Sequence, residues 1–309
     1  MDTEVTYCLD DLEHLEFPGV PLAVVGQPVA HSVSPAMHRA ALHKLEVEHP
    51  EFKNWAYYRF EIAPDELSRA LPLFHQKQFR GLNLTVPHKV IALDLVRDVS
   101  SDARLMGAVN TLVWEDGGYL GHNTDGYGLK SALKMNLGIT LRGSHVILLG
   151  AGGAARAAAV QCLLEGCERL YVANRSAERL KGLLSVLGEL PGEAVKRVEI
   201  FDLSGLPAEL PKEGVLVNAT SLGLKEDDPL PLNTTDLPIG WKVYDMIYNP
   251  PQTKLLKQIS ERGMAGANGL SMLVYQGARS LEIWSEQTVD AGVMSSAASK
   301  ALNLRSHEL

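Results

Sequence analysis

Residues 145–155 read HVILLGAGGAA, and this stretch decides the fold. Four of its first five residues, Val146 to Leu149, are apolar, which is typical of a short buried strand. Gly150, Gly152 and Ala155 then fit the pattern G-x-G-x-x-G/A, in which small residues permit a tight turn and let the backbone approach a pyrophosphate. The alanine-rich residues 154–165 predict a helix, whose first amide groups attract phosphate. A strand, this turn and a helix in that order predict a Rossmann-like dinucleotide-binding domain.

Strand and helix signals alternate on both sides of this turn, which indicates parallel sheets covered by helices on both faces. Strands are expected at residues 22–26, 55–62, 81–85, 145–149, 170–173, 195–201, 215–218 and 243–246, with a hairpin joining 108–114 to 119–121. Helices are expected to begin near Pro35 and at residues 64–66, and to occupy 270–290 and 294–303.

A chain of 309 residues is long for one core, so two α/β domains are expected. Residues 1–125 would form an N-terminal α/β substrate domain, and 126–269 a Rossmann-like NADP-binding domain, with a cleft between them. The helices from about 270 to 309 would complete the first domain.

Composition excludes several classes of function. The net charge is −8 and no basic run occurs, so nucleic acid is a poor partner. No stretch of about 20 apolar residues is present, and the N-terminus lacks a secretory signal, so no membrane association is expected. Cys8, Cys162 and Cys167 are too few for a disulfide framework, which favours a reducing cytoplasm. No His or Cys pair has metal-ligand spacing, and no metal is expected.

The tip of the second Rossmann strand indicates which dinucleotide binds. An NAD site usually places a carboxylate there, about 20 residues after the first glycine, to bind the ribose 2′-hydroxyl. Here the tip is Asn174-Arg175-Ser176, with Arg179 one turn later. Guanidinium groups suit a 2′-phosphate, so NADP is favoured. Two solvated arginines at a helix start are the alternative.

Six further clusters accompany the glycine turn. They read GQPVAHSVSP at 26–35, GLNLTVPHK at 81–89, GAVNT at 107–111, NTDG at 123–126, NATS at 218–221 and YQG at 275–277. Together, in this order, they resemble the shikimate dehydrogenase family. The resemblance implies reversible reduction of 3-dehydroshikimate to shikimate with NADPH, a step in aromatic amino-acid biosynthesis.

The resemblance also implies the catalytic pair. Reduction of a carbonyl by hydride needs a proton donor at the developing alkoxide. Lys89 is implied as this acid/base, with Asp125 as its partner. Taken alone, Lys89 reads more naturally as a surface lysine, and the surrounding motif reverses that preference.

The family pattern assigns the remaining site residues. Those implied for substrate binding are Ser32, Ser34, Thr85, Asn110, Tyr248 and Gln276, the two serines holding the substrate carboxylate. Those implied for the cofactor are Gly150, Ala151, Gly152, Gly153, Ala154, Asn174, Arg175, Ser176, Arg179, Thr220, Met246 and Gly269. Alternatives remain open: Ser34 suits a helix N-cap before Pro35, Asn83 and Asn110 suit amides that bind loop backbone, and Tyr248 and Met246 suit core positions.

Two other functions remain in view. A quinate/shikimate dehydrogenase that uses NAD or both cofactors would share the motifs, although the missing carboxylate at Asn174 argues against strict NAD use. A non-catalytic NADP sensor would share the fold, but it has no need of the pair Lys89 and Asp125. A small-molecule substrate and a monomer or homodimer are expected.

Overall fold

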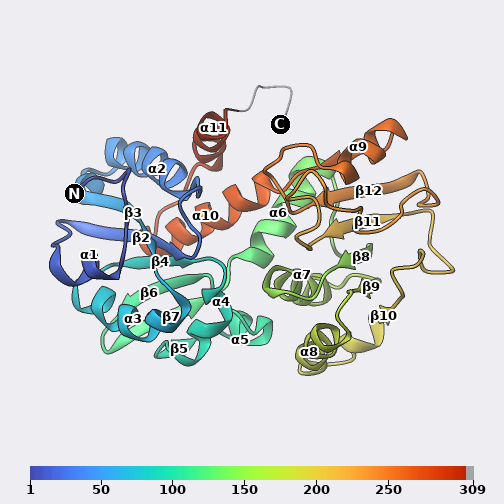
Figure 1. Ribbon diagram of the computed structural model, residues 1–309, viewed down its shortest axis with the longest axis horizontal. Coiled ribbons are helices and arrows are strands. Elements are labelled where there is room, and N and C mark those ends of the chain that lie inside the picture. Colours follow the sequence, from blue (N-terminus) through green and yellow to red (C-terminus); the bar gives the residue numbers. More distant parts are fainter. Residues whose placement is uncertain (304–309) are drawn as a thin grey trace. The chain divides into compact units, whose positions relative to one another are not determined.

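The computed structural model describes residues 1–303, which form two compact units (Figure 1). The first unit contains Met1–Thr124 and Gln276–Asn303, and the second contains Asp125–Tyr275. The chain therefore passes between the units twice. The second passage lies inside one helix, α10 (Leu270–Ser285). The sequence placed the divisions after residues 125 and 269.

The first unit is built on a seven-stranded mixed sheet in the order β1-β3-β2-β4-β6-β7-β5. Its strands are β1 (Thr6–Tyr7), β2 (Val20–Gly26), β3 (Trp55–Glu61), β4 (Gly81–Leu84), β5 (Asp98–Val99), β6 (Thr111–Glu115) and β7 (Gly118–His122). The run β1-β3-β2-β4 is parallel, and β6 is antiparallel to both β4 and β7. The expected hairpin is present, turning at Asp116 and at Gly117, whose φ of +84° suits glycine.

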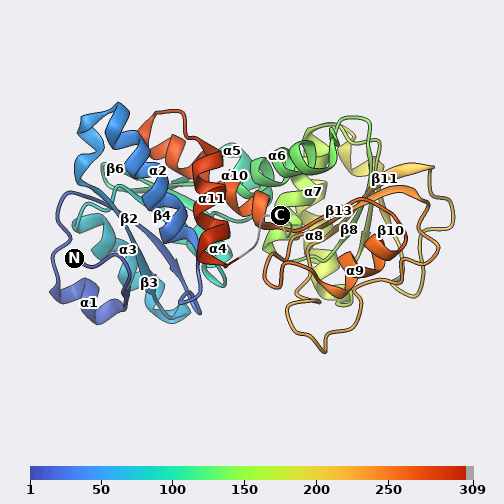
Figure 2. The same ribbon diagram turned by 90° about the horizontal axis from the view of Figure 1, so that it is seen from above.

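Helices cover both faces of this sheet. They are α1 (Leu9–His14), α2 (Ser34–Glu48), α3 (Leu67–Gln76), α4 (His88–Ile91), α5 (Ser101–Met106), the later part of α10, and α11 (Ala291–Ala301). Figure 2 shows α11 along α2, and Lys44 on α2 binds Asp290, the N-cap of α11, with Nζ and Oδ2 2.6 Å apart. The C-terminal helices thus belong to the first unit.

The core of the first unit differs between the two sheet faces, because successive strand residues point to opposite sides. Tyr58 and Phe60 face a cluster of edge-to-face aromatic rings. Tyr57 faces α2 and α10. There Trp284 donates from Nε1 to the carbonyl of Leu112 at 2.9 Å and lies where a Cβ on Gly81 would be, 2.2 Å away. Helix α10 is therefore part of this core.

The second unit is a six-stranded parallel sheet in the order β10-β9-β8-β11-β12-β13. Its strands are β8 (His145–Leu149), β9 (Arg169–Ala173), β10 (Val198–Ile200), β11 (Glu213–Asn218), β12 (Gly240–Asp245) and β13 (Gly266–Ala267), and its helices include α6 (Asp125–Leu137), α7 (Gly153–Leu164), α8 (Ala177–Gly188) and α9 (Lys254–Glu261). In chain order this is 3-2-1-4-5-6, the dinucleotide-binding arrangement. The predicted α/β class with a Rossmann-like C-terminal domain is confirmed.

One predicted strand is too long. Residues 195–201 were expected to be extended, but Ala194–Arg197 form a 3₁₀ turn and only Val198–Ile200 pair with β9. This strand is at the sheet edge, and none of its residues is fully buried, so little packing extends it. No helix within residues 1–303 is long and apolar enough to cross a membrane.

Candidate functional site

The glycine turn lies at the carboxyl end of β8. Gly150 has φ +116°, and a Cβ there would lie 2.9 Å from the carbonyl oxygen of Ala219, so only glycine fits. By contrast, a Cβ on Gly152 or Gly153 would meet nothing within 4 Å. Gly152 is the N-cap of α7, and no side chain caps that helix. The turn therefore offers open space beside free helix amides, which fits a pyrophosphate.

The neighbouring strand places a second loop beside the turn. β11 pairs with β8, and Ala219 donates its backbone N–H to the carbonyl of Leu149 at 2.9 Å. The strand order reverses between β8 and β11, and ligands of open α/β sheets bind at that point, outside the carboxyl ends. Thr220, which follows Ala219, is therefore close to the expected position of a dinucleotide.

The tip of β9 carries two exposed guanidinium groups. Asn174 donates from Nδ2 to the carbonyl of Ser176 at 2.8 Å, and the Ser176 hydroxyl accepts from the amide of Arg179 at 3.3 Å as the N-cap of α8. Asn174 and Ser176 thus have structural roles. Arg175 and Arg179 are exposed, and neither forms an ion pair with any part of the chain from 1 to 303. They are available to an anion.

The loops after β12 and β13 are packed tightly together. A Cβ on Gly269 would lie 2.0 Å from the carbonyl oxygen of Met246, and its N–H donates to the carbonyl of Ile247 at 3.1 Å. Close backbone contact therefore explains this glycine without a ligand. Met246 and Tyr248 are partly exposed, and burial raises the pKa of Tyr248.

Sequence reasoning missed Asp245, which ends β12. Its side chain is completely buried and accepts hydrogen bonds from Asn218, Thr253 and a backbone amide. Burial raises its pKa, and the bonds from Thr253, Ile247 and Asn218 oppose that rise. A carboxylate at the carboxyl end of a strand, at the ligand-binding edge of the sheet, was the available signal.

In the first unit, a buried polar cluster joins α10 to the ends of the central strands. Its members are Tyr57, Asn83, Asn110, Thr111, Thr124 and Ser280. The Ser280 hydroxyl is 2.7 Å from that of Thr111 and 3.2 Å from that of Thr124, and it donates to the carbonyl of Gln276 at 2.9 Å. Such a network is strong when its groups are satisfied, so it fixes these chain segments.

Both asparagines of this cluster bind backbone, as the structural alternative expected. Asn83 accepts from Tyr57 at 2.7 Å and donates to the carbonyl of Asn110 at 3.2 Å. The Asn110 Oδ1 accepts from the amide of Thr124 at 2.8 Å, and its Nδ2 donates to Gln276 Oε1 at 3.3 Å. Asn110 and Gln276, both implied as substrate residues, are thus in contact.

The serine loop is capped differently from the expectation. Ser34 is not the N-cap: it is the first residue of α2, it is buried, and Val33 is the cap. Instead, the Ser32 hydroxyl accepts from the amide of Ser34 at 3.3 Å. Capping by Ser34 was the alternative that Pro35 suggested, but the helix begins at Ser34 itself. Ser32 is partly exposed.

The segment carrying Lys89 leaves β4 beside the serine loop, because β2 and β4 are adjacent and parallel. A Cβ on Gly26 would lie 2.3 Å from Cγ2 of Thr85, so the two loops touch where they begin. Lys89 is partly exposed in α4, and its carbonyl accepts from the amide of Val109 at 2.8 Å. Both Lys89 and Thr85 are therefore at the carboxyl edge of the parallel strands.

Asp125 is the first residue of the second unit and the first of α6, and it is 4% exposed. It directly follows Thr124, which Asn110 holds through both its amide and its hydroxyl. A buried carboxylate is costly unless charge or hydrogen bonds compensate it.

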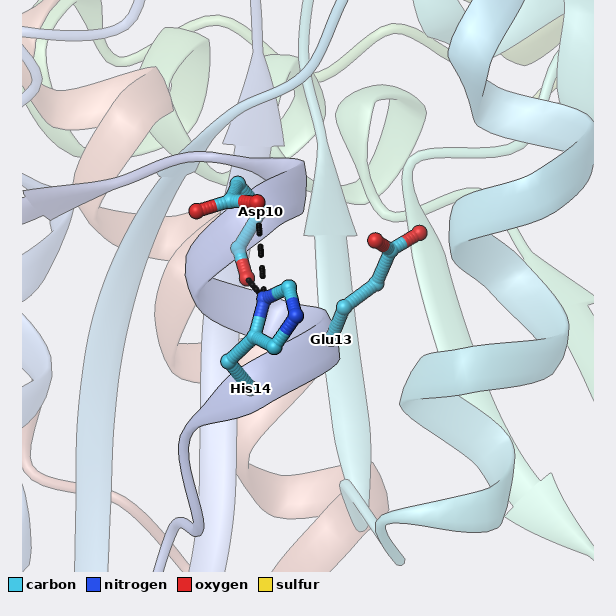
Figure 3. Close-up of side chains that lie close together, drawn as sticks. All are labelled: Asp10, Glu13 and His14. Atoms are coloured by element: carbon cyan, nitrogen blue, oxygen red, sulfur yellow. Dashed lines mark hydrogen bonds and ion pairs between the residues drawn. The ribbon is translucent and has the colours of Figure 1, made fainter.

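Figure 3 shows the one group within the described chain that has the geometry of a metal site. Asp10, Glu13 and His14 on α1 bring one ligand atom each within 4.8 Å of the others, and all are exposed. His14 already pairs with Asp10 at 3.4 Å, and Glu13 with Arg69 at 2.6 Å. Ordinary surface ion pairs explain this group.

Comparisons with known proteins agree on one family. The model described as the shikimate dehydrogenase substrate binding domain matches residues 24–112, the one described as shikimate / quinate 5-dehydrogenase matches 131–223, and the shikimate 5′-dehydrogenase C-terminal domain matches 269–298.

Whole-chain relatives extend this similarity. Shikimate dehydrogenase (NADP(+)) from Methanopyrus kandleri is 37% identical over 88% of this chain and 92% of its own length, and that from Rubrobacter xylanophilus is 40% identical over 88% and 93%. A structure of shikimate 5-dehydrogenase from Thermus thermophilus with NADP(H) and shikimate has a TM-score of 0.78 and 36% identity, covering 91% of this chain and 99% of that one. The structure of 5-ketofructose reductase from Gluconobacter has a TM-score of 0.80 and 33% identity, covering 92% and 99%.

Proposed function

The chain belongs to the shikimate dehydrogenase family, and on that basis we propose how its residues divide the work of the reaction. The enzyme reduces 3-dehydroshikimate reversibly to shikimate with NADPH, a step in aromatic amino-acid biosynthesis. NADPH supplies the hydride. The observation that carries the assignment is the open glycine turn at the switch point, in a chain that matches NADP-dependent relatives over nearly their whole length.

Lys89 is proposed as the proton donor to the carbonyl oxygen, and Asp125 as its carboxylate partner. Lys89 is on a segment held at both ends, by the Thr85 carbonyl before it and by the Val109 amide on its own carbonyl. Asp125 is buried next to Thr124, which the polar cluster fixes. A general acid must be protonated and held in place before it donates, and these contacts hold the segments that carry both residues.

The substrate carboxylate is proposed to bind the Ser32 and Ser34 hydroxyls, and the ring hydroxyls to bind Thr85, Asn110, Gln276 and Tyr248. Contact between the Ser32 and Thr85 loops at their origins, and between Asn110 and Gln276, supports a shared site. Groups that bind a hydroxyl are left unpaired by an analogue lacking it, so such a site rejects that analogue strongly.

The residues proposed to hold the cofactor fall into two sets. Amides of Gly150 to Ala154 would meet the pyrophosphate, and Arg175 and Arg179, with Asn174 and Ser176 shaping the loop, would meet the 2′-phosphate. Thr220, Met246 and Gly269 would border the nicotinamide end. The exposed guanidinium groups, without a carboxylate at the strand tip, support NADP over NAD.

The test of the chemistry is Lys89→Ala, followed by absorbance at 340 nm with shikimate and NADP. We expect kcat to fall at least ~10²-fold, as loss of a general acid does, with a smaller change in KM. Lys53→Ala, on an exposed lysine of the same unit, is the matched control and should turn over normally. Near-normal turnover of Lys89→Ala would remove Lys89 from the mechanism.

Initial rates with shikimate or quinate, each with NADP or NAD, separate the quinate/shikimate alternative. A family model named for both substrates motivates the comparison. Preference for quinate with NAD would replace the proposed specificity. A protein that binds NADPH but reduces neither acid would instead be the NADP sensor. The proposed compartment is the cytoplasm, where the free thiols of Cys8, Cys162 and Cys167 stay reduced.

A further inference from the structure

A buried carboxylate ties together the two loops proposed to border the nicotinamide end. Asp245, at the end of β12, is 0% exposed. Its Oδ1 accepts from Asn218 Nδ2 at 2.9 Å and from the amide of Ile247 at 3.1 Å, and its Oδ2 accepts from the Thr253 hydroxyl at 2.7 Å. No cation within the chain from 1 to 303 pairs with it. The hydrogen bonds to its carboxylate come from neutral donors.

Asn218 carries the network into the loop after β11. Its Oδ1 accepts from Thr220 twice, from the amide at 3.1 Å and from the hydroxyl at 2.7 Å. The Thr220 hydroxyl in turn accepts from the amide of Leu222 at 3.1 Å, and the Asn218 carbonyl accepts from the amide of Met246 at 2.9 Å. The positions of Thr220 and Met246 thus depend on one asparagine, which Asp245 orients.

Thr253 carries the network into α9. Its side chain is 2% exposed, and its hydroxyl caps the helix by accepting from the amide of Leu256 at 3.3 Å while donating to Asp245. The methyl group of Thr253 would lie 3.3 Å from a Cβ on Gly223. The loop after β11 therefore rests against Thr253 as well as binding Asn218.

We propose that Asp245 is a positioning residue, which through Asn218 and Thr253 sets the Thr220 loop and the Met246 loop in register to receive the nicotinamide end of NADP. This inference rests on the proposed roles of Thr220 and Met246. Its physical basis is that a buried charge contributes little net stability compared with a well-packed apolar group, whereas its directional hydrogen bonds fix the atoms that donate them. Asp245 is fully buried, so it is proposed to act only through these neighbours.

The test measures binding without turnover, by titration calorimetry of NADPH and of 2′,5′-ADP, which lacks the nicotinamide end. Thr253→Val removes the hydroxyl that donates a hydrogen bond to Asp245. We expect Kd for NADPH to rise about tenfold, the worth of one hydrogen bond to a charged group, and Kd for 2′,5′-ADP to change less than about twofold. Thr253→Ser keeps the hydroxyl and should restore NADPH binding.

Thr234→Val is the matched control. Thr234 is also fully buried in the second unit, and its hydroxyl binds Gln258 on the same helix α9 at 2.7 Å, outside this network. Loss of stability without loss of NADPH affinity is expected there. If Thr253→Val does not fold, Asp245→Asn, which keeps the side-chain shape, replaces it with the same expected split between the two ligands.

Two outcomes would overturn the inference. One is that Thr253→Val, or its replacement, binds NADPH as Thr234→Val does, which would make the network purely structural. The other is an equal loss of affinity for both ligands. Arg175→Ala should weaken the binding of 2′,5′-ADP as well as that of NADPH. If Arg175→Ala binds both ligands normally, that result would count against the proposed cofactor site and not against the role of Asp245.

Discussion

Acidification should destabilise the first unit through one buried histidine. His38 on α2 is 0% exposed, stacks on Tyr57 with ring centroids 4.0 Å apart, and places Nδ1 2.9 Å from the carbonyl of Ser34. Among residues 1–303, no group lies within hydrogen-bonding geometry of its Nε2. Burial lowers the pKa of His38 from 6.5 to about 4, although the carbonyls of Ser34 and Gly277 favour the charged form.

Proton binding by His38 sets the direction and the size of the change in the free energy of unfolding with pH. Because the folded-state pKa is below the unfolded one, the unfolded chain binds a proton first. The stability that depends on neutral His38 is fully present above pH 6.5 and is lost progressively as the pH falls toward 4. With values of 6.5 and about 4, the loss between pH 7.5 and pH 5 is about 2 kcal/mol. His88 and His122 have pKa values that burial also lowers, so they add in the same direction.

The assay is urea unfolding at pH 7.5 and pH 5, followed by tryptophan fluorescence. Trp284, whose ring is 5.9 Å from that of His38, reports on the first unit. In His38→Asn the amide nitrogen takes the place of Nδ1 and does not titrate. That variant should be less stable at both pH values, because a cavity remains, but its pH-dependent loss should be about 2 kcal/mol smaller than that of the parent protein.

His43→Asn, at an exposed position on the same helix, should leave the pH-dependent loss unchanged. If His38→Asn loses as much stability on acidification as the parent protein, buried His38 is not the origin of the effect.

The cofactor site gives the remaining predictions. Arg175→Ala should raise KM for NADPH and affect NADH less, because only NADPH has the 2′-phosphate; an equal change for both in rates at 340 nm would refute that role. Gly152→Val should raise Kd for NADPH at least ~10-fold in titration calorimetry with little change in melting temperature, since its side chain would meet only open space. Gly269→Ala should instead lower the melting temperature, because its Cβ would meet the carbonyl of Met246 at 2.0 Å; unchanged unfolding would contradict this packing.

Local signals predicted the second unit well. The apolar run before Gly150 and the alanine-rich helix after it need only neighbouring residues to be recognised, and β8 has its predicted bounds. The two-residue strands β1 and β5 carry no such signal, because they exist only through pairing with β3 and β7. The 3₁₀ turn before β10 likewise reflects weak packing at a sheet edge.

The sequence motifs name the candidate site residues, but they do not show which residues these contact. Motif residues named Ser32 and Ser34, but which serine serves the start of α2 depends on where that helix begins. The amides of Asn83 and Asn110 bind partners that are distant in the chain, including Ser280 and Gln276. Such contacts between distant segments are invisible to spacing rules.

The order in which the chain is synthesised has a consequence for folding. In the first unit, Trp284 occupies the space above Gly81 and α11 packs along α2, so its core is incomplete until α11 has left the ribosome. The described part of the second unit, Asp125–Tyr275, is translated before then. Nascent domains usually fold from the N-terminus onward. Here most of the first unit is translated before the second unit, and the helices that complete its core are translated after it.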